Sequence, residues 1–144
     1  MTPLTEILAE KGDVVLRVDA DSSVLDAVRR MVDFNVGSLL VTDHGRDIGI
    51  VTERDYLRRV TLEGRDEHQT PVREIISSPL VVVTAETTVE ECMALMTDRR
   101  IRHVPVVGTD GRVVGLVSIG DLVKFRTKQQ SFELQYLTEY ITAH

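Results

Sequence analysis

An internal repeat constrains this chain more than any other feature, because the same pattern of residues occurs twice in the same order. Its clearest part is a seven-residue motif, which reads Gly49-Ile50-Val51-Thr52-Glu53-Arg54-Asp55 in the first copy. The second copy reads Gly115-Leu116-Val117-Ser118-Ile119-Gly120-Asp121. Both contain a glycine, two aliphatic residues, a hydroxyl residue, two variable positions and an aspartate. A helical pattern follows each motif, so each is predicted to join a strand to the start of a helix.

The repeat covers most of the chain. Each copy opens with a Pro-initiated helical turn, at residues 2–8 and 70–76, and a short aliphatic strand follows, at residues 14–18 and 80–83. An amphipathic helix comes next, with apolar residues at the spacing of one helix face. Those residues are Val24, Ala27, Val28 and Met31 in the first copy and Val89, Cys92, Met93 and Met96 in the second. Asp21 or Ser22, and Thr87 or Thr88, are the predicted N-caps of these helices.

Two further strands, joined by a tight turn that contains glycine, lead into each motif. Each copy is therefore predicted to fold as β-α-β-β-α with a short helix in front, which gives an α/β (α+β) fold. One unit of ~60 residues would bury only about 60% of its unfolded surface. We therefore expect the two units to pack their sheets on each other around one core, with pseudo-two-fold symmetry and a cleft between them. The expected divisions are residues 1–66, 67–130 and a C-terminal helical extension at 131–144.

Composition excludes several classes of protein. The 144 residues carry a net charge of −6, whereas a nucleic-acid partner normally requires a basic surface. No apolar run approaches the ~18 residues of a membrane span, and the N-terminus lacks the pattern of a signal peptide. The single cysteine, Cys92, fits a buried core thiol in a reducing compartment. We therefore expect a cytoplasmic protein without a nucleic-acid or membrane partner.

The sequence offers no catalytic constellation. The four histidines, at positions 44, 68, 103 and 144, do not have the spacing of metal ligands. Neither the dinucleotide-binding glycine pattern nor the phosphate-binding loop of nucleotide hydrolases occurs. Ser118 has no recognisable base partner. We therefore expect no enzyme, no metal site and no catalytic cofactor.

The repeated motif has two interpretations. Thr52 with Asp55, and Ser118 with Asp121, have the spacing of a capping box, in which the side chains satisfy backbone groups at a helix start. Alternatively, the motif forms a ligand site, because a strand that ends at a helix N-terminus favours anions. Carboxylates suit the hydroxyls of a ribose, whereas arginine, histidine and hydroxyl groups suit phosphate. These are the components of a nucleotide site.

Both repeats resemble CBS domains, and the pair resembles a Bateman module. The resemblance rests on the two motifs above and on Ile101-Arg102-His103-Val104-Pro105-Val106-Val107, and it covers all but about the last dozen residues. It implies an adenosine-containing regulatory ligand in the cleft between the repeats. AMP is the first expectation, with ADP, ATP, NAD(H) and S-adenosylmethionine as alternatives.

The resemblance also implies the roles of individual residues. Asp55 and Asp121 would hold ribose hydroxyls, Thr52 and Ser118 would approach ribose or phosphate, and Arg102 and His103 would approach phosphates. Adenine would lie against backbone near Val15 and Val81, beside Val36 and Ile101. The full expected set is Val15, Val36, Gly37, Ser38, Thr52, Arg54, Asp55, Val81, Ile101, Arg102, His103, Val104, Pro105, Ser118 and Asp121.

The two predicted sites differ. Gly37 and Ser38 of the first copy correspond to Arg102 and His103 of the second, so the first copy lacks this cation. We therefore expect the phosphorylated nucleotide in the second site, with Arg54 reaching across the cleft. Two functions of different class follow: a nucleotide sensor that regulates a protein partner in trans, or a ligand-free dimerisation or scaffold module.

The C-terminal segment has no counterpart in the first copy. Phe132, Tyr136 and Tyr140 recur at every fourth position, and Leu134, Leu137 and Ile141 form a second apolar stripe. A helix that is apolar on two sides seldom stays on the surface of a monomer. We expect this helix to pack across a homodimer interface; the alternative is that it packs onto its own domain.

Overall fold

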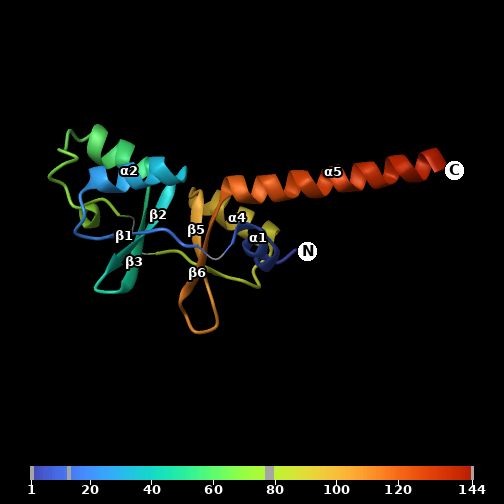
Figure 1. Ribbon diagram of the computed structural model, residues 1–144, viewed down its shortest axis with the longest axis horizontal. Coiled ribbons are helices and arrows are strands. Elements are labelled where there is room, and N and C mark those ends of the chain that lie inside the picture. Colours follow the sequence, from blue (N-terminus) through green and yellow to red (C-terminus); the bar gives the residue numbers. More distant parts are fainter. Residues whose placement is uncertain (1, 13, 77–79, 144) are drawn as a thin grey trace.

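The computed structural model describes residues 2–12, 14–76 and 80–143, which form two similar α/β units (Figure 1). The first unit contains β1 (Arg17–Asp19), α2 (Val24–Phe34), β2 (Ser38–Asp43), β3 (Arg46–Thr52) and α3 (Glu53–Tyr56), which continues as a π-helical turn at Leu57–Thr61. The second contains β4 (Val83–Thr84), α4 (Val89–Arg99), β5 (His103–Val107), β6 (Val113–Ser118) and α5 (Ile119–Ala143). Helix α1 (Leu4–Lys11) precedes the first unit, and a 3-10 turn, Val72–Glu74, precedes the second. The predicted β-α-β-β-α order is confirmed.

Each unit has one three-stranded sheet, in the order β1-β2-β3 or β4-β5-β6. The first two strands of each sheet run parallel and the last two run antiparallel. In the antiparallel register Ser38 lies opposite Thr52, and His103 lies opposite Ser118. The hydroxyl residue of each motif therefore lies beside the first residue of the neighbouring strand, at the helix end of the hairpin.

The opening strands and one cap differ from the prediction. Pairing begins at Arg17 in β1 and at Val83 in β4, later than the predicted strands, although the Leu16 carbonyl still accepts a 3.0 Å hydrogen bond from the Leu40 N–H of β2. Val14, predicted as strand, is 80% exposed.

Helix α2 is capped by Ser23, whose hydroxyl accepts the Asp26 N–H at 3.1 Å, and not by Asp21 or Ser22. A turn at residues 19–22, closed by the Ser22 N–H bonded to the Asp19 carbonyl, delays the helix start. Thr88 caps α4, as predicted.

The buried apolar side chains form two clusters, so the prediction of a single core was wrong. Each sheet is covered by its own helix and by the segment that precedes the other unit. Leu4 and Ile7 of α1 lie in the cluster of the second unit, whereas Val72 and Ile75 lie in that of the first. Backbone hydrogen bonds from Leu4 to Thr87 (2.9 Å) and from Val72 to Ser22 (2.8 Å) fix this exchange. The exchanged segments hold the two units together.

The motif glycine of the second unit allows α1 to pack closely. A Cβ atom at Gly115 would overlap the Leu8 Cδ2 atom, so a larger residue requires α1 to move or Leu8 to change rotamer. Helix α1 consequently lies beside α4 and β6 in the second unit, although it precedes the first unit in the chain (Figure 1). Cys92 is fully buried in the same cluster, as predicted.

Helix α5 is one continuous helix that contains both the end of the second unit and the predicted extension. Leu122 is buried and Phe125 packs against the second cluster near the start of the helix, whereas its C-terminal part projects away from the two units (Figure 1). Phe132, Leu134 and Leu137 are 67%, 65% and 53% exposed, so these side chains do not pack onto their own domain. The side chains of Tyr136, Tyr140 and Ile141 lie outside the described residues. Across the described ranges, no helix is both long enough and apolar enough to cross a bilayer.

Candidate functional site: two cavities between the repeats

One cavity, called here the Asp121 cavity, combines residues of both units in a volume of about 260 Å³. The first unit and its leading segment contribute Lys11, Val14, Leu16, Asn35, Val36, Gly37 and Ser38; the second contributes His103, Leu116, Ser118 and Asp121. Gly37 lets the two repeats approach closely in this wall, because a Cβ atom there would lie 3.2 Å from the His103 Cε1 atom and the imidazole would have to shift by a few tenths of an ångström. The cavity therefore brings a carboxylate, a hydroxyl, an imidazole and an ammonium group to one place.

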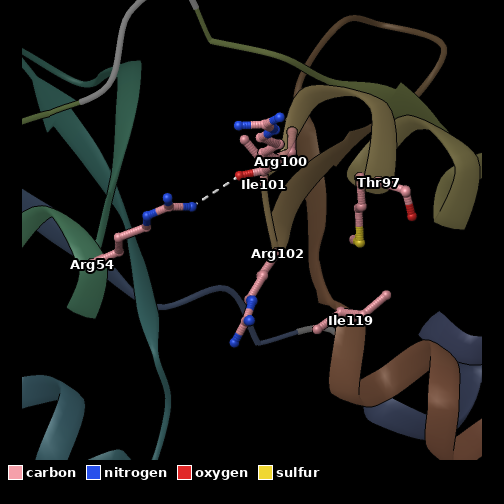
Figure 2. A pocket seen from close by; sticks show the side chains of 7 residues that line it. Arg54, Thr97, Arg100, Ile101, Arg102 and Ile119 are labelled. Atoms are coloured by element: carbon pink, nitrogen blue, oxygen red, sulfur yellow. Dashed lines mark hydrogen bonds between the residues drawn. The ribbon is translucent and has the colours of Figure 1, made fainter.

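A second cavity, called here the Arg102 cavity, has a volume of about 290 Å³. It is lined by Arg54, Met96, Thr97, Arg100, Ile101, Arg102 and Ile119. Figure 2 shows Arg54 extending from the first unit toward the backbone of the second, where its Nη1 atom donates a 3.2 Å hydrogen bond to the Arg100 carbonyl. Arg54 thus reaches across between the units. The lining contains three arginines and no acidic residue, so this cavity suits anions.

Both motifs also form the predicted helix caps. The Thr52 hydroxyl accepts the Asp55 N–H at 3.2 Å, and an Asp55 carboxylate oxygen accepts the Thr52 N–H at 2.9 Å. Ser118 and Asp121 make the same pair of bonds, at 3.1 and 2.9 Å. The capping interpretation is therefore confirmed in geometry at both places. Asp55 is 8% exposed and lines neither cavity, whereas Asp121 caps its helix and lines a cavity as well.

Sequence reasoning missed Lys11, the last residue of α1. Gly12, whose φ is +92°, ends this helix in a conformation that favours glycine. The Lys11 ammonium donates 2.6 Å hydrogen bonds to an Asp121 carboxylate oxygen and to the Leu116 carbonyl. A lysine before a helix-terminating glycine signals a favourable charge at the helix C-terminus, which does not by itself indicate a site.

The electrostatics of the Asp121 cavity follow from these contacts. Burial alone would raise the pKa of Asp121, but hydrogen bonds from Lys11 and Ser118 outweigh it and lower that pKa below its usual value. Burial lowers the pKa of His103, and Glu53 and Asp121 only partly oppose this. At neutral pH the cavity therefore contains a charged carboxylate and a neutral imidazole beside the Lys11 side chain.

Comparisons with known proteins agree with this arrangement. A family model described as the CBS domain matches residues 12–61 and again residues 72–128. The chain belongs to the CBS domain family. Its two units are thus CBS repeats, and the pair fills most of the chain.

Similar proteins include a mitochondrial CBS domain-containing protein of Arabidopsis thaliana, 41% identical over 97% of this chain and 72% of that protein. Among solved structures, a protein with CBS domains from Burkholderia ambifaria is 41% identical, with a TM-score of 0.86 over 90% of this chain and 96% of that one. A CBS-CP12 protein from bloom-forming cyanobacteria, described as hexameric, is 30% identical, with a TM-score of 0.75 over 85% of this chain and 70% of that one. At least one related protein therefore assembles from several copies.

The structure groups some of the expected site residues and separates others. Val36, Gly37 and Ser38 of the first CBS repeat meet His103, Ser118 and Asp121 of the second in the Asp121 cavity, whereas Arg54, Ile101 and Arg102 share the Arg102 cavity. The remaining expected residues line neither cavity: Val15, Thr52, Asp55, Val81, Val104 and Pro105.

Arg102 and His103, expected in one site, line different cavities. They are consecutive residues at the start of a strand, and successive side chains of extended backbone point to opposite sides. The backbone next to Val15 contributes Val14 and Leu16 to the Asp121 cavity instead. Within the described residues, no group of histidine, cysteine, aspartate or glutamate residues could hold a metal ion.

Proposed function

We propose that this chain is a regulatory CBS-pair module that binds an adenosine nucleotide between its repeats and modulates a protein partner in trans. The observation that carries the proposal is the Asp121 cavity, in which side chains of both repeats meet around one polar space. A regulatory role in place of catalysis agrees with the family to which the chain belongs.

The residues present fit such a ligand. Asp121 provides acceptors for ribose hydroxyls, and Ser118, His103 and Lys11 provide polar groups for ribose or phosphate. Val14, Leu16 and Val36 provide apolar surface for a base. Small-molecule sites typically measure roughly 300–1,000 Å³, so the two cavities, at about 260 and 290 Å³, lie just below that range. This size favours one mononucleotide per cavity over a dinucleotide, which supports AMP ahead of NAD(H).

Longer phosphate chains are better suited to the Arg102 cavity. Arg54 and Arg102 belong to different repeats, and both guanidinium groups lie near the same space (Figure 2). Arginine forms strong, charge-assisted hydrogen bonds with phosphate oxygens. ADP and ATP are therefore the preferred candidates for this cavity.

Regulation follows from the position of the cavities between the repeats. A ligand that contacts both repeats stabilises one relative arrangement of them, and this difference in affinity can be passed to a partner. Exposed apolar residues on α5 provide a surface for a second copy of the chain, and we propose a homodimer through this helix. A cytoplasmic location stays an expectation from the sequence, since the Arabidopsis relative is named as mitochondrial.

The second candidate is a ligand-free scaffold module. Its support is that both motif carboxylates already cap their helices, which accounts for the repeated motif without any ligand. In this case the module acts only through its assembly.

A thermal-shift screen with AMP, ADP, ATP, NADH and S-adenosylmethionine distinguishes the two candidates. A ligand at a hundred times its Kd adds about 2.7 kcal/mol to the free energy of unfolding, which raises the melting temperature by several degrees. We expect stabilisation by at least one adenosine nucleotide. If none of the five compounds raises the melting temperature, the scaffold function is favoured.

A further inference from the structure

The Lys11 ammonium group occupies a fixed position in the wall of the Asp121 cavity. Its 2.6 Å hydrogen bonds to an Asp121 carboxylate oxygen and to the Leu116 carbonyl use two donors. An ammonium group has three donors, so one is left for a ligand in the cavity. The hydrogen bonds that the Asp121 carboxylate accepts from the Lys11 ammonium and from the Ser118 N–H both end on its Oδ2 atom. The Oδ1 atom therefore stays available to a ribose hydroxyl while Lys11 keeps its place.

The position of Lys11 is set by the rigid part of the fold. Helix α1 packs its Leu8 side chain onto Gly115, and Gly12 ends the helix directly after Lys11. The ion pair between Glu10 and Lys128, at 3.5 Å, lies at the same helix end, but both side chains are more than half exposed, so it contributes little to this position. The ammonium group is thus held in place before any ligand binds, which reduces the entropic cost of using it.

Lys11 also decides the charge of the cavity. Its other titratable lining groups are the Asp121 carboxylate and the His103 imidazole, and Glu53 lies next to Gly37 and His103. With Lys11 present, the ammonium and the carboxylate balance. Without Lys11, a carboxylate that has lost its counter-charge would face the ligand, with a second acidic residue nearby, and would repel a phosphate group.

We propose that Lys11 is the residue that makes the Asp121 cavity select a nucleoside 5′-phosphate over the uncharged nucleoside. This specificity rests on the proposed nucleotide-binding function. It also makes the two cavities unequal, because the sequence of the second repeat has no lysine between its leading turn and its first strand, at residues 75–82. The Arg102 cavity takes its cations from arginines instead.

The test compares AMP and adenosine binding to the full chain by titration calorimetry, for the parent and for Lys11→Met. All titrations use an Arg102→Ala background, which weakens phosphate binding in the other cavity. The matched control is Lys128→Met, which removes another lysine from the α1–α5 contact without touching the cavity. Lys11→Arg tests rescue by a retained charge, and thermal unfolding without ligand verifies that every variant is folded.

We expect Lys11→Met to weaken AMP binding about 10- to 100-fold, the range for one charge-assisted hydrogen bond. Adenosine binding should change less than about threefold, and Lys128→Met should leave both affinities unchanged. Lys11→Arg should restore most of the AMP affinity. If Lys11→Met changes AMP and adenosine affinities equally, tightens both or changes neither, the proposed specificity is wrong while the nucleotide-binding function stands. If the parent chain with Arg102 intact binds neither compound, the nucleotide-binding function itself fails.

Discussion

The Arg54 guanidinium donates a 3.2 Å hydrogen bond to the backbone carbonyl of Arg100, and this bond links the first CBS repeat to the second beside the Arg102 cavity. Arg100 ends α4 in the left-handed conformation, with a φ of +55°, which is uncommon for a residue other than glycine or asparagine. One contact thus connects the motif of the first repeat to a helix end of the second.

Replacing Arg54 by alanine should weaken ATP binding about tenfold, because a guanidinium group is lost from an anion-binding wall. The free energy of unfolding should change by less than about 1 kcal/mol, since the side chain is exposed. Calorimetry with ATP measures the first effect and denaturant unfolding the second. Arg58→Ala, a change to an exposed arginine nearby that does not line either cavity, is the control. Equal ATP affinities for the two variants would contradict this role of Arg54.

Gly115→Ala should lower the free energy of unfolding by about 1–3 kcal/mol, because the added Cβ atom overlaps the Leu8 side chain. Removing the Leu8 side chain should relieve the overlap. In a double-mutant cycle we therefore expect Gly115→Ala to cost at least about 1 kcal/mol less in a Leu8→Ala background. Additive effects would show that the two residues are not in contact.

The pH dependence of stability should report His103. Its folded-state pKa lies below the model-compound value of 6.5 because burial disfavours the charged imidazole. The unfolded chain therefore binds more protons than the folded chain as the pH falls below about 6.5, and stability declines until the folded-state pKa is passed. His103→Asn should flatten the pH dependence between pH 7 and 5. An unchanged slope in that variant would assign the decline to other groups.

A chain that ends at Thr127 should be monomeric in solution, because it lacks the exposed Phe132, Leu134 and Leu137 side chains of α5. The full-length chain should have the mass of a dimer, and light scattering after size-exclusion chromatography measures both. Substituting Phe132 and Leu134 by serine in the full-length chain should give the same result without shortening the helix. Identical association states for the full and shortened chains would remove α5 from the interface.

The repeat and the order of elements could be predicted from the sequence because they depend on local signals. Periodicity of 3.6 identifies α2 and α4, and glycine-containing turns identify the two hairpins. The capping bonds of Thr52 and Ser118 follow from residue spacing alone. These features require no knowledge of how distant segments pack.

Three other features could not be predicted from the sequence, because no local signal indicates them. Leu4, which precedes the first repeat, lies in the core of the second, and Val72, which opens the second repeat, lies in the core of the first. The order of residues in the sequence gives no sign of this exchange. Lys11 meets Asp121 only because α1 packs on the second repeat. The division of Arg102 and His103 between two cavities depends on which side of the strand faces each space. All three depend on tertiary packing.

Binding of an adenosine nucleotide at Asp121 underlies the proposed function, and calorimetry with AMP tests this binding directly. The parent chain should bind AMP, and Asp121→Ala should weaken that binding about 10- to 100-fold. Asp121→Asn, which keeps an oxygen for the helix cap, controls for loss of the cap. Asp55→Asn should have a smaller effect, since Asp55 lines neither cavity. Unchanged AMP affinity in both Asp121 variants, together with lost binding in Asp55→Asn, would contradict the account.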